Sequence, residues 1–118
     1  MEKKRILLVD DEESIQLLYR EEFEEEGYIV DSARDGAEAL AKFKENPPDL
    51  VLLDINMPGM NGIEVLRQMK EMRASLPIIL NSAYQEYKQD FGSWASEAYV
   101  VKSADMDELK ATVRKYIG

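Results

Sequence analysis

Residues 50–62 read LVLLDINMPGMNG, in which four apolar residues lead into an aspartate and then into a turn containing proline and glycine. A second run of the same kind, ILLVDD, occupies residues 6–11. Strands that are apolar at every position are typical of the centre of a parallel sheet covered on both faces. We therefore expect residues 6–9 and 50–53 to form central strands, each ending in an acidic residue.

Three further apolar runs begin near Tyr28, Pro77 and Ala98, and the intervals between the runs have helical periodicity. This alternation predicts a doubly wound α/β domain, a (βα)5 sandwich with helices on both faces of a five-stranded parallel sheet. The run over residues 28–33 contains Asp31, which favours an edge strand. We expect the strand order 2-1-3-4-5 of flavodoxin-like sheets, in which ligands bind at the carboxyl ends of the strands.

The helices are delimited by recognisable end signals. The first is expected over about Glu13 to Glu26, with Ile15, Leu18 and Phe23 facing the core and Gly27 as its stop. Asp or Asn followed three residues later by Glu resembles a capping box, and three such pairs precede amphipathic segments: Asp35 with Glu38, Asn61 with Glu64, and Asp105 with Glu108. A fourth helix is expected around residues 85–95.

Composition limits the possible functions. The 118 residues fit one domain, and we expect residues 1–118 to form it. A net charge of −9 disfavours direct nucleic-acid binding. The chain has no histidine, which excludes a self-contained Ser–His or His–metal centre, and no cysteine, which suits a reducing cytoplasm. We expect a cytoplasmic domain that does not insert into a membrane.

Polar and charged residues follow four of the five predicted strands: Asp10 and Asp11, Asp54, Ser82, and Lys102. Each alone has an ordinary explanation, such as acids at a helix N-terminus, an aspartate-initiated turn, a serine N-cap or a surface lysine. Together at one sheet edge, three carboxylates repel one another unless a cation intervenes. Mg²⁺ suits such oxygen ligands and leaves positions for a phosphate. The set therefore indicates phosphoryl transfer to a carboxylate.

These residues lie in segments that resemble the receiver domain of two-component response regulators: LLVDDE (7–12), LLDINMPGMNG (52–62), NSA (81–83) and YVVK (99–102). The resemblance covers the whole chain in order. It implies that Asp54 is the phosphoacceptor and that Lys102 and Ser82 contact the phosphoryl group. It implies Tyr99 as the aromatic switch residue coupled to Ser82.

For the metal, the resemblance implies that Mg²⁺ is held by Asp11, by Asp10 through water, by Asp54 and by the backbone carbonyl of Asn56. It implies a donor phosphohistidine on a sensor histidine kinase or a histidine phosphotransfer protein, which must act in trans. An effector would then bind the face made by the fourth helix, the fifth strand and the fifth helix. The resemblance implies a monomer or a switch-dependent dimer. Catalysis would be limited to the domain's own phosphorylation and aspartyl-phosphate hydrolysis, so we expect no enzyme acting on a separate substrate.

Three positions depart from the family's pattern. Ser103 follows the lysine where the family usually has a proline after a cis peptide bond, and a cis bond to a non-proline costs about 2.5–4 kcal/mol. We therefore predict a trans Lys102–Ser103 bond. Glu97-Ala98 replaces the family's frequent Gly-Ala. Tyr84, two residues after Ser82, is expected to shield the phosphoryl group partly from water.

Two other functions compete with a phosphorylation switch. A degenerate receiver would act as a phosphorylation-independent interaction module, which only Ser103 favours. An aspartate-nucleophile phosphatase would need a second acid two residues after Asp54, where the chain has Asn56. The retained aspartates, serine and lysine favour the switch.

Overall fold

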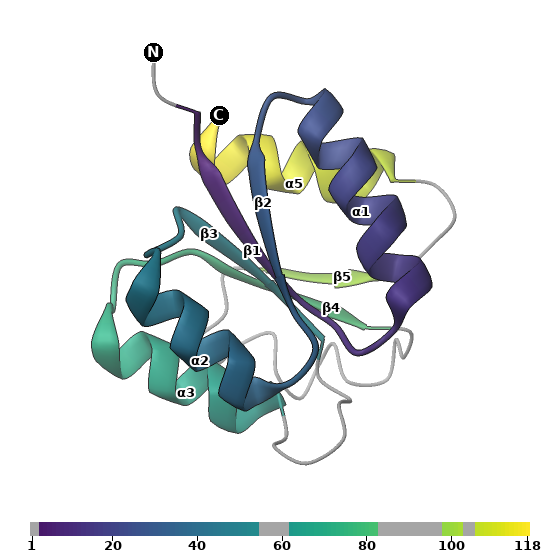
Figure 1. Ribbon diagram of the computed structural model, residues 1–118. Coiled ribbons are helices and arrows are strands. Elements are labelled where there is room, and N and C mark those ends of the chain that lie inside the picture. The colour runs from purple at the N-terminus through teal and green to yellow at the C-terminus, as the bar shows by residue number, and fades with distance from the viewer. Residues whose placement is uncertain (1–2, 55–61, 83–97, 103–105) are drawn as a thin grey trace.

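The computed structural model describes residues 3–54, 62–82, 98–102 and 106–118, and of Ser82 and Tyr99 it describes only the backbone. Five parallel strands form one sheet in the order β2-β1-β3-β4-β5, as the sequence predicts (Figure 1). The strands are β1 (Arg5–Val9), β2 (Ile29–Ala33), β3 (Leu50–Leu53), β4 (Ile78–Ser82) and β5 (Ala98–Val101). The predicted edge strand is β2, and the two strands that contain the apolar runs 6–9 and 50–53, β1 and β3, pair with each other.

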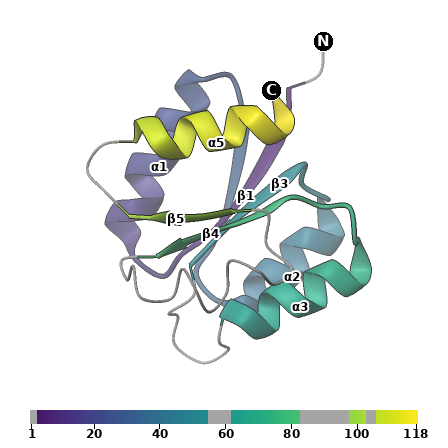
Figure 2. The same ribbon diagram turned by 180° about the vertical axis from the view of Figure 1, so that it is seen from behind.

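The described helices cover both faces of this sheet (Figures 1 and 2). They are α1 (Glu13–Glu25), α2 (Gly36–Glu45), α3 (Gly62–Met72) and α5 (Asp107–Ile117). Helices α1 and α5 lie on one face, and α2 and α3 lie on the other. The predicted helix around residues 85–95 lies outside the described residues.

Alternation along the strands divides the core into two layers. Leu7 and Val9 of β1 belong to the layer under α2 and α3, where Phe43 and Met69 are also buried. Ile6 and Leu8 belong to the other layer, under α1 and α5. Because successive side chains in a strand point to opposite faces, one apolar strand supplies both layers. This accounts for the absence of polar residues between Ile6 and Val9.

Helix α1 ends as predicted, but its buried face differs from the prediction. Gly27 has a φ of 97°, a conformation that glycine adopts without steric cost, and Tyr28 N donates to Phe23 O at 3.1 Å as in a Schellman motif. Tyr19 and Phe23 are buried, whereas Leu18, predicted to face the core, is 41% exposed. Residues four apart share a helix face, so Tyr19 and Phe23 form the inward stripe.

Two of the predicted capping boxes fall on helices whose starts the structure describes. Asp35 caps α2 as predicted by accepting a hydrogen bond from Glu38 N at 2.8 Å, whereas Glu38 Oε1 accepts from Arg34 N and not from the N-cap residue. Helix α5 begins at Asp107, which places Met106 at the N-cap position, one residue later than predicted. Asp105 itself lies outside the described residues, so its predicted contact with Glu108 stays a prediction. The remaining box starts at Asn61, which lies outside the described residues.

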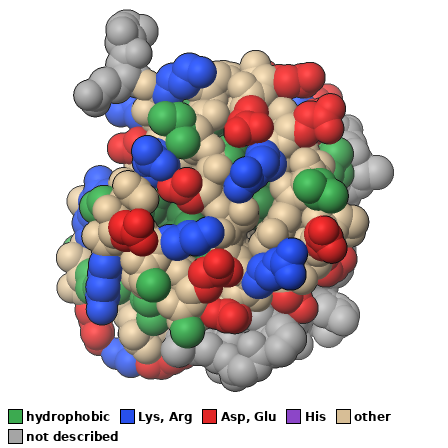
Figure 3. All heavy atoms as spheres, in the orientation of Figure 1, with side chains coloured by type: hydrophobic (Ala, Val, Ile, Leu, Met, Phe, Trp, Pro, Cys, Tyr) green, Lys and Arg blue, Asp and Glu red, His purple; other side chains and the backbone are tan. Residues whose placement is uncertain are grey.

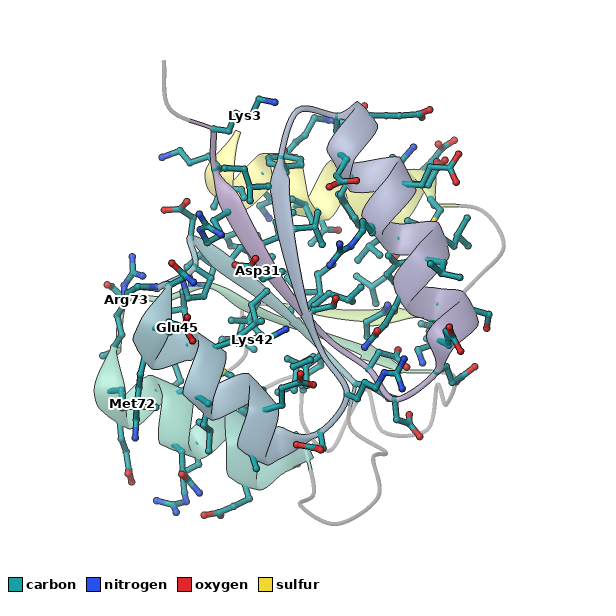
Figure 4. The ribbon with its side chains drawn as sticks, viewed as in Figure 1. Lys3, Asp31, Lys42, Glu45, Met72 and Arg73 are labelled. Atoms are coloured by element: carbon teal, nitrogen blue, oxygen red, sulfur yellow. The ribbon has the colours of Figure 1, made fainter. Side chains whose placement is uncertain are left out.

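Polar contacts surround the apolar layers. On the β2 edge, Asp31 accepts from Arg5 Nη1 at 2.7 Å, and Lys42 extends from α2 toward β2 to donate to Ser32 O at 2.5 Å (Figure 4). Acidic and basic side chains are interspersed over the face shown in Figure 3. None of the described helices is long and apolar enough to cross a membrane.

Candidate functional site

The register of the two central strands places two aspartates beside each other at the carboxyl edge of the sheet. Val9 pairs with Leu53, so the residues that follow, Asp10 and Asp54, are neighbours. Asp54 N donates to Val9 O at 2.9 Å, and Asp10 N donates to Ala33 O at 3.0 Å. Both aspartates are buried, with exposed fractions of 1% and 4%. The backbone hydrogen bonds therefore fix two carboxylates side by side, where they have little contact with solvent.

Lys102, which follows β5, reaches across this edge to the two aspartates. Its Nζ lies 2.7 Å from Asp10 Oδ2 and 3.5 Å from Asp54 Oδ2, and its side chain is only 10% exposed. Glu12 Oε1 lies 3.4 Å from the same nitrogen. The lysine is therefore not a solvated surface residue. It is the cation that balances carboxylates at the ends of two other strands.

The electrostatics of Lys102 follow from this position. Burial on its own would lower the pKa of the Lys102 ammonium, because a charged group loses hydration. The hydrogen bond and the charge of Asp10, with the charges of Asp54 and Glu12, act in the opposite direction and raise the pKa above its usual value. Lys102 therefore remains protonated at every physiological pH.

A third carboxylate completes the cluster. Asp11 is exposed, and one oxygen each from Asp10, Asp11 and Asp54 lie within 4.8 Å of one another. Oxygen-only ligands with at least one face open to water match the preference of Mg²⁺, which keeps several of its own waters. The donor set thus fits the ion that the sequence predicts.

Gln16, which is not among the predicted site residues, holds the backbone beneath these carboxylates. Its Nε2 donates to Asp10 O at 2.6 Å and to Ala33 O at 3.0 Å, so one amide joins the ends of β1 and β2. Asp10 Oδ1 also accepts from Glu12 N at 2.9 Å, which shapes the turn that presents Asp11. A glutamine one turn into a helix gives no sequence signal for this role, because it depends on where the ends of β1 and β2 lie.

The remaining predicted site residues are described only in part. Ser82 ends β4 opposite Val101, the residue before Lys102, and Tyr99 lies within β5. Their backbones are at the expected edge and strand, but their side chains lie outside the description. Asn56, Tyr84 and Ser103, and with Ser103 the predicted trans peptide bond, lie outside the described residues.

Comparison with known proteins identifies this arrangement. The family model for the response regulator receiver domain matches residues 6–114. The chain belongs to this family. The receiver domain is 38% identical over 119 residues to sporulation initiation phosphotransferase F of Bacillus subtilis, with 99% of this chain and 96% of the relative covered. It is also 38% identical to the B. subtilis transcriptional regulator PhoP, of which it covers 47%. It therefore spans about half of that relative's length.

Solved structures agree with the family assignment. The response regulator TrrA of Thermotoga maritima, in complex with Mg²⁺ and BeF, has a TM-score of 0.91 and 50% identity, with 96% of this receiver domain and 98% of TrrA covered. A structure of the histidine kinase ThkA in complex with TrrA matches with a TM-score of 0.90, also at 50% identity, over 98% of this chain and 99% of the matched chain. The predicted family and fold are confirmed.

Proposed function

We propose that this receiver domain accepts a phosphoryl group from a phosphohistidine onto Asp54 and that this modification switches its affinity for a partner. The observation that supports it is the position of Asp54, a buried carboxylate within 3.5 Å of Lys102 Nζ and beside two further acids. A carboxylate is already ionised at neutral pH and needs no general base to act as a nucleophile. This explains how a chain without histidine can carry out the reaction.

In the proposed step, an oxygen of Asp54 forms a bond to phosphorus while the bond between phosphorus and the histidine nitrogen of the donor breaks. The electron pair of that bond stays with the imidazole. Hydrolysis later returns the carboxylate when water attacks phosphorus and inorganic phosphate leaves. Most of the rate in such transfers comes from positioning and charge neutralisation. The chain supplies both through its buried, hydrogen-bonded strand ends.

Asp10, Asp11 and Asp54, with the backbone carbonyl of Asn56, would hold Mg²⁺. When bound, the ion neutralises charge that develops on the transferred phosphoryl oxygens. Lys102 Nζ lies 2.7 Å from Asp10 Oδ2 and 3.5 Å from Asp54 Oδ2, so its ammonium is placed to donate to a phosphoryl oxygen on Asp54.

The switch and the partners follow the family's pattern. We propose that the Ser82 hydroxyl binds the new phosphoryl group and that Tyr99 changes rotamer with it, altering the face that includes β5 and α5 for an effector. A sensor histidine kinase or phosphotransfer protein is the proposed donor. The complex of TrrA with the kinase ThkA, at 50% identity to this chain, supports a kinase. We further propose a cytoplasmic receiver domain over residues 1–118 whose only catalysis is its own phosphorylation and dephosphorylation.

The test is incubation with Mg²⁺ and a small acyl phosphate, followed by intact-mass measurement of wild type and Asp54→Asn. We expect the wild type alone to gain one phosphoryl group, and a chelator to prevent the gain. Failure of both proteins to gain mass would instead favour a degenerate interaction module. Catalytic release of phosphate from an added phosphomonoester would favour a phosphatase.

A further inference from the structure

A pocket of about 100 Å³ lies between α1, the ends of β4 and β5, and the start of α5. Figures 1 and 2 show α1 and α5 side by side on this face of the sheet. The pocket has an apolar wall and a polar end. The wall is made by Val100, Val101, Met106 and Leu109; Tyr19 and Asn81 are the buried polar residues, and Glu108 also contributes.

The polar end contains two buried groups that only partly satisfy each other. Asn81 Nδ2 donates to Tyr19 Oη at 2.9 Å, and the two side chains are 3% and 2% exposed. Among the described residues, Asn81 Oδ1 has no hydrogen-bond partner. Within the described part of the chain, the Tyr19 hydroxyl accepts the hydrogen bond from Asn81 Nδ2 but has no acceptor for its own proton. A buried acceptor without a partner is energetically unfavourable, so a molecule that supplies the partner is favoured in this pocket.

The pair of groups specifies what the missing partner must be. One atom must donate to Asn81 and accept from Tyr19, which a hydroxyl group does. If the Asn81 amide is turned over, Tyr19 donates to Oδ1 and the orphan becomes the Nδ2 donor, which a hydroxyl oxygen also satisfies. An ammonium ion offers no acceptor for Tyr19, and an anion is opposed by the carboxylate of Glu108 in the lining.

Burial raises the pKa of the Tyr19 hydroxyl, with smaller effects from Asn81, Lys102 and the site aspartates. Tyr19 therefore remains a neutral donor at physiological pH. The charges of the phosphorylation site act on this hydroxyl, but the pocket lining contains none of its aspartates and not Lys102.

The size of the pocket indicates more than a single water. A water needs roughly 10–15 Å³ of such volume, while a dry cavity of about 150 Å³ accommodates benzene. The space thus fits about four non-hydrogen atoms. We propose that this pocket binds a small neutral alcohol, with its hydroxyl between Asn81 and Tyr19 and its short aliphatic chain against Val100, Val101 and Leu109.

Propan-1-ol is a suitable probe, and methoxyethane, its isomer without an O–H group, is the matched control. In a two-dimensional amide NMR titration of the full chain, we expect saturable shifts at Val100, Val101 and Leu109 with a dissociation constant on the order of millimolar. Methoxyethane should bind roughly tenfold more weakly, because it cannot donate to Asn81.

Asn81→Leu keeps the number and branching of the side-chain heavy atoms and removes both the amide oxygen and the amide nitrogen, and Tyr19→Phe removes only the hydroxyl. Each should weaken propanol binding roughly tenfold, and the dispersion of the amide spectrum reports whether each variant is folded. Shifts that rise linearly without saturation would overturn the proposal, because the pocket would then hold water only. Equal affinity for the alcohol and the ether, or undiminished binding in folded Tyr19→Phe, would also overturn it.

Discussion

Replacing Lys102 by methionine removes the cation that balances the buried carboxylates. At an effective dielectric constant of 20, the separations of 2.7 Å from Asp10 and 3.5 Å from Asp54 correspond to about 6 and 5 kcal/mol of attraction before desolvation is counted. Dehydration of the ammonium offsets much of this attraction, and removing one partner of a buried pair typically costs about 3–5 kcal/mol. Without Mg²⁺, we expect the free energy of unfolding to fall by about 3 kcal/mol. This is the lower end of that range, because the site lies at the edge of the sheet and is partly open to water.

The same substitution should increase the response to Mg²⁺. Lys102 and the ion compete for the same carboxylates, so Lys102→Met should bind Mg²⁺ at least about tenfold more tightly, equivalent to about 1.4 kcal/mol. Urea unfolding with and without saturating Mg²⁺ measures both effects. Lys110→Met is the matched control, since Lys110 pairs at 2.6 Å with Glu22 of α1 and belongs to none of the site's contacts. A loss below about 1 kcal/mol without Mg²⁺, or equal stabilisation of both variants by the ion, would refute this reasoning.

Three further changes test other parts of the structure. Gln16→Leu leaves the backbone carbonyls of Asp10 and Ala33 without their shared donor, so urea unfolding should show a loss of about 1–3 kcal/mol in the free energy of unfolding. A Mg²⁺ titration should show weaker binding. Unchanged Mg²⁺ affinity would restrict Gln16 to a structural role. Gly27→Ala places a side chain at a residue with φ 97° and should cost about 1–2 kcal/mol by the same assay, although no atom of the described residues lies within 4 Å of the added carbon. Increased stability would contradict this. Burial raises the pKa of Tyr19, so the folded state holds this proton more tightly than the unfolded state does. Stability should therefore fall as pH rises above about 10. The fall should be shallower in Tyr19→Phe, and an identical pH dependence in the two proteins would contradict the raised pKa of Tyr19. Lys102, whose folded pKa is also raised, adds to the fall in the same direction.

The sequence predicts the sheet well because its strands are set by strong local patterns. Residues 6–9 and 50–53 are apolar at every position, which is typical of parallel strands buried on both faces, and their pairing is confirmed. The inward face of α1 was predicted less well, since Leu17 and Leu18 are both apolar and both exposed. Which stripe of an amphipathic helix is buried depends on its docking against the sheet, and here that docking buries the aromatic rings of Tyr19 and Phe23.

The charged part of the site was predictable because parallel strands bring their carboxyl ends to one edge. Asp10, Asp54 and Lys102 therefore had to converge once the strand order was known, and the structure confirms their proximity. The contacts of Gln16 and Asn81 were not predictable, since each joins segments through a single side-chain amide with no sequence pattern. The roles of Ser82 and Tyr99 remain predictions.

The most direct test of the proposed function locates the phosphoryl group. After reaction with an acyl phosphate and Mg²⁺, borohydride reduction converts an aspartyl phosphate to homoserine, which tandem mass spectrometry assigns to one position. We predict homoserine at position 54, because the receiver-domain pattern assigns the phosphoacceptor to Asp54, a buried carboxylate 3.5 Å from Lys102 Nζ and beside Asp10 and Asp11. Homoserine at position 10 or 11 instead, or none in a protein that binds Mg²⁺, would contradict Asp54 as the phosphoacceptor.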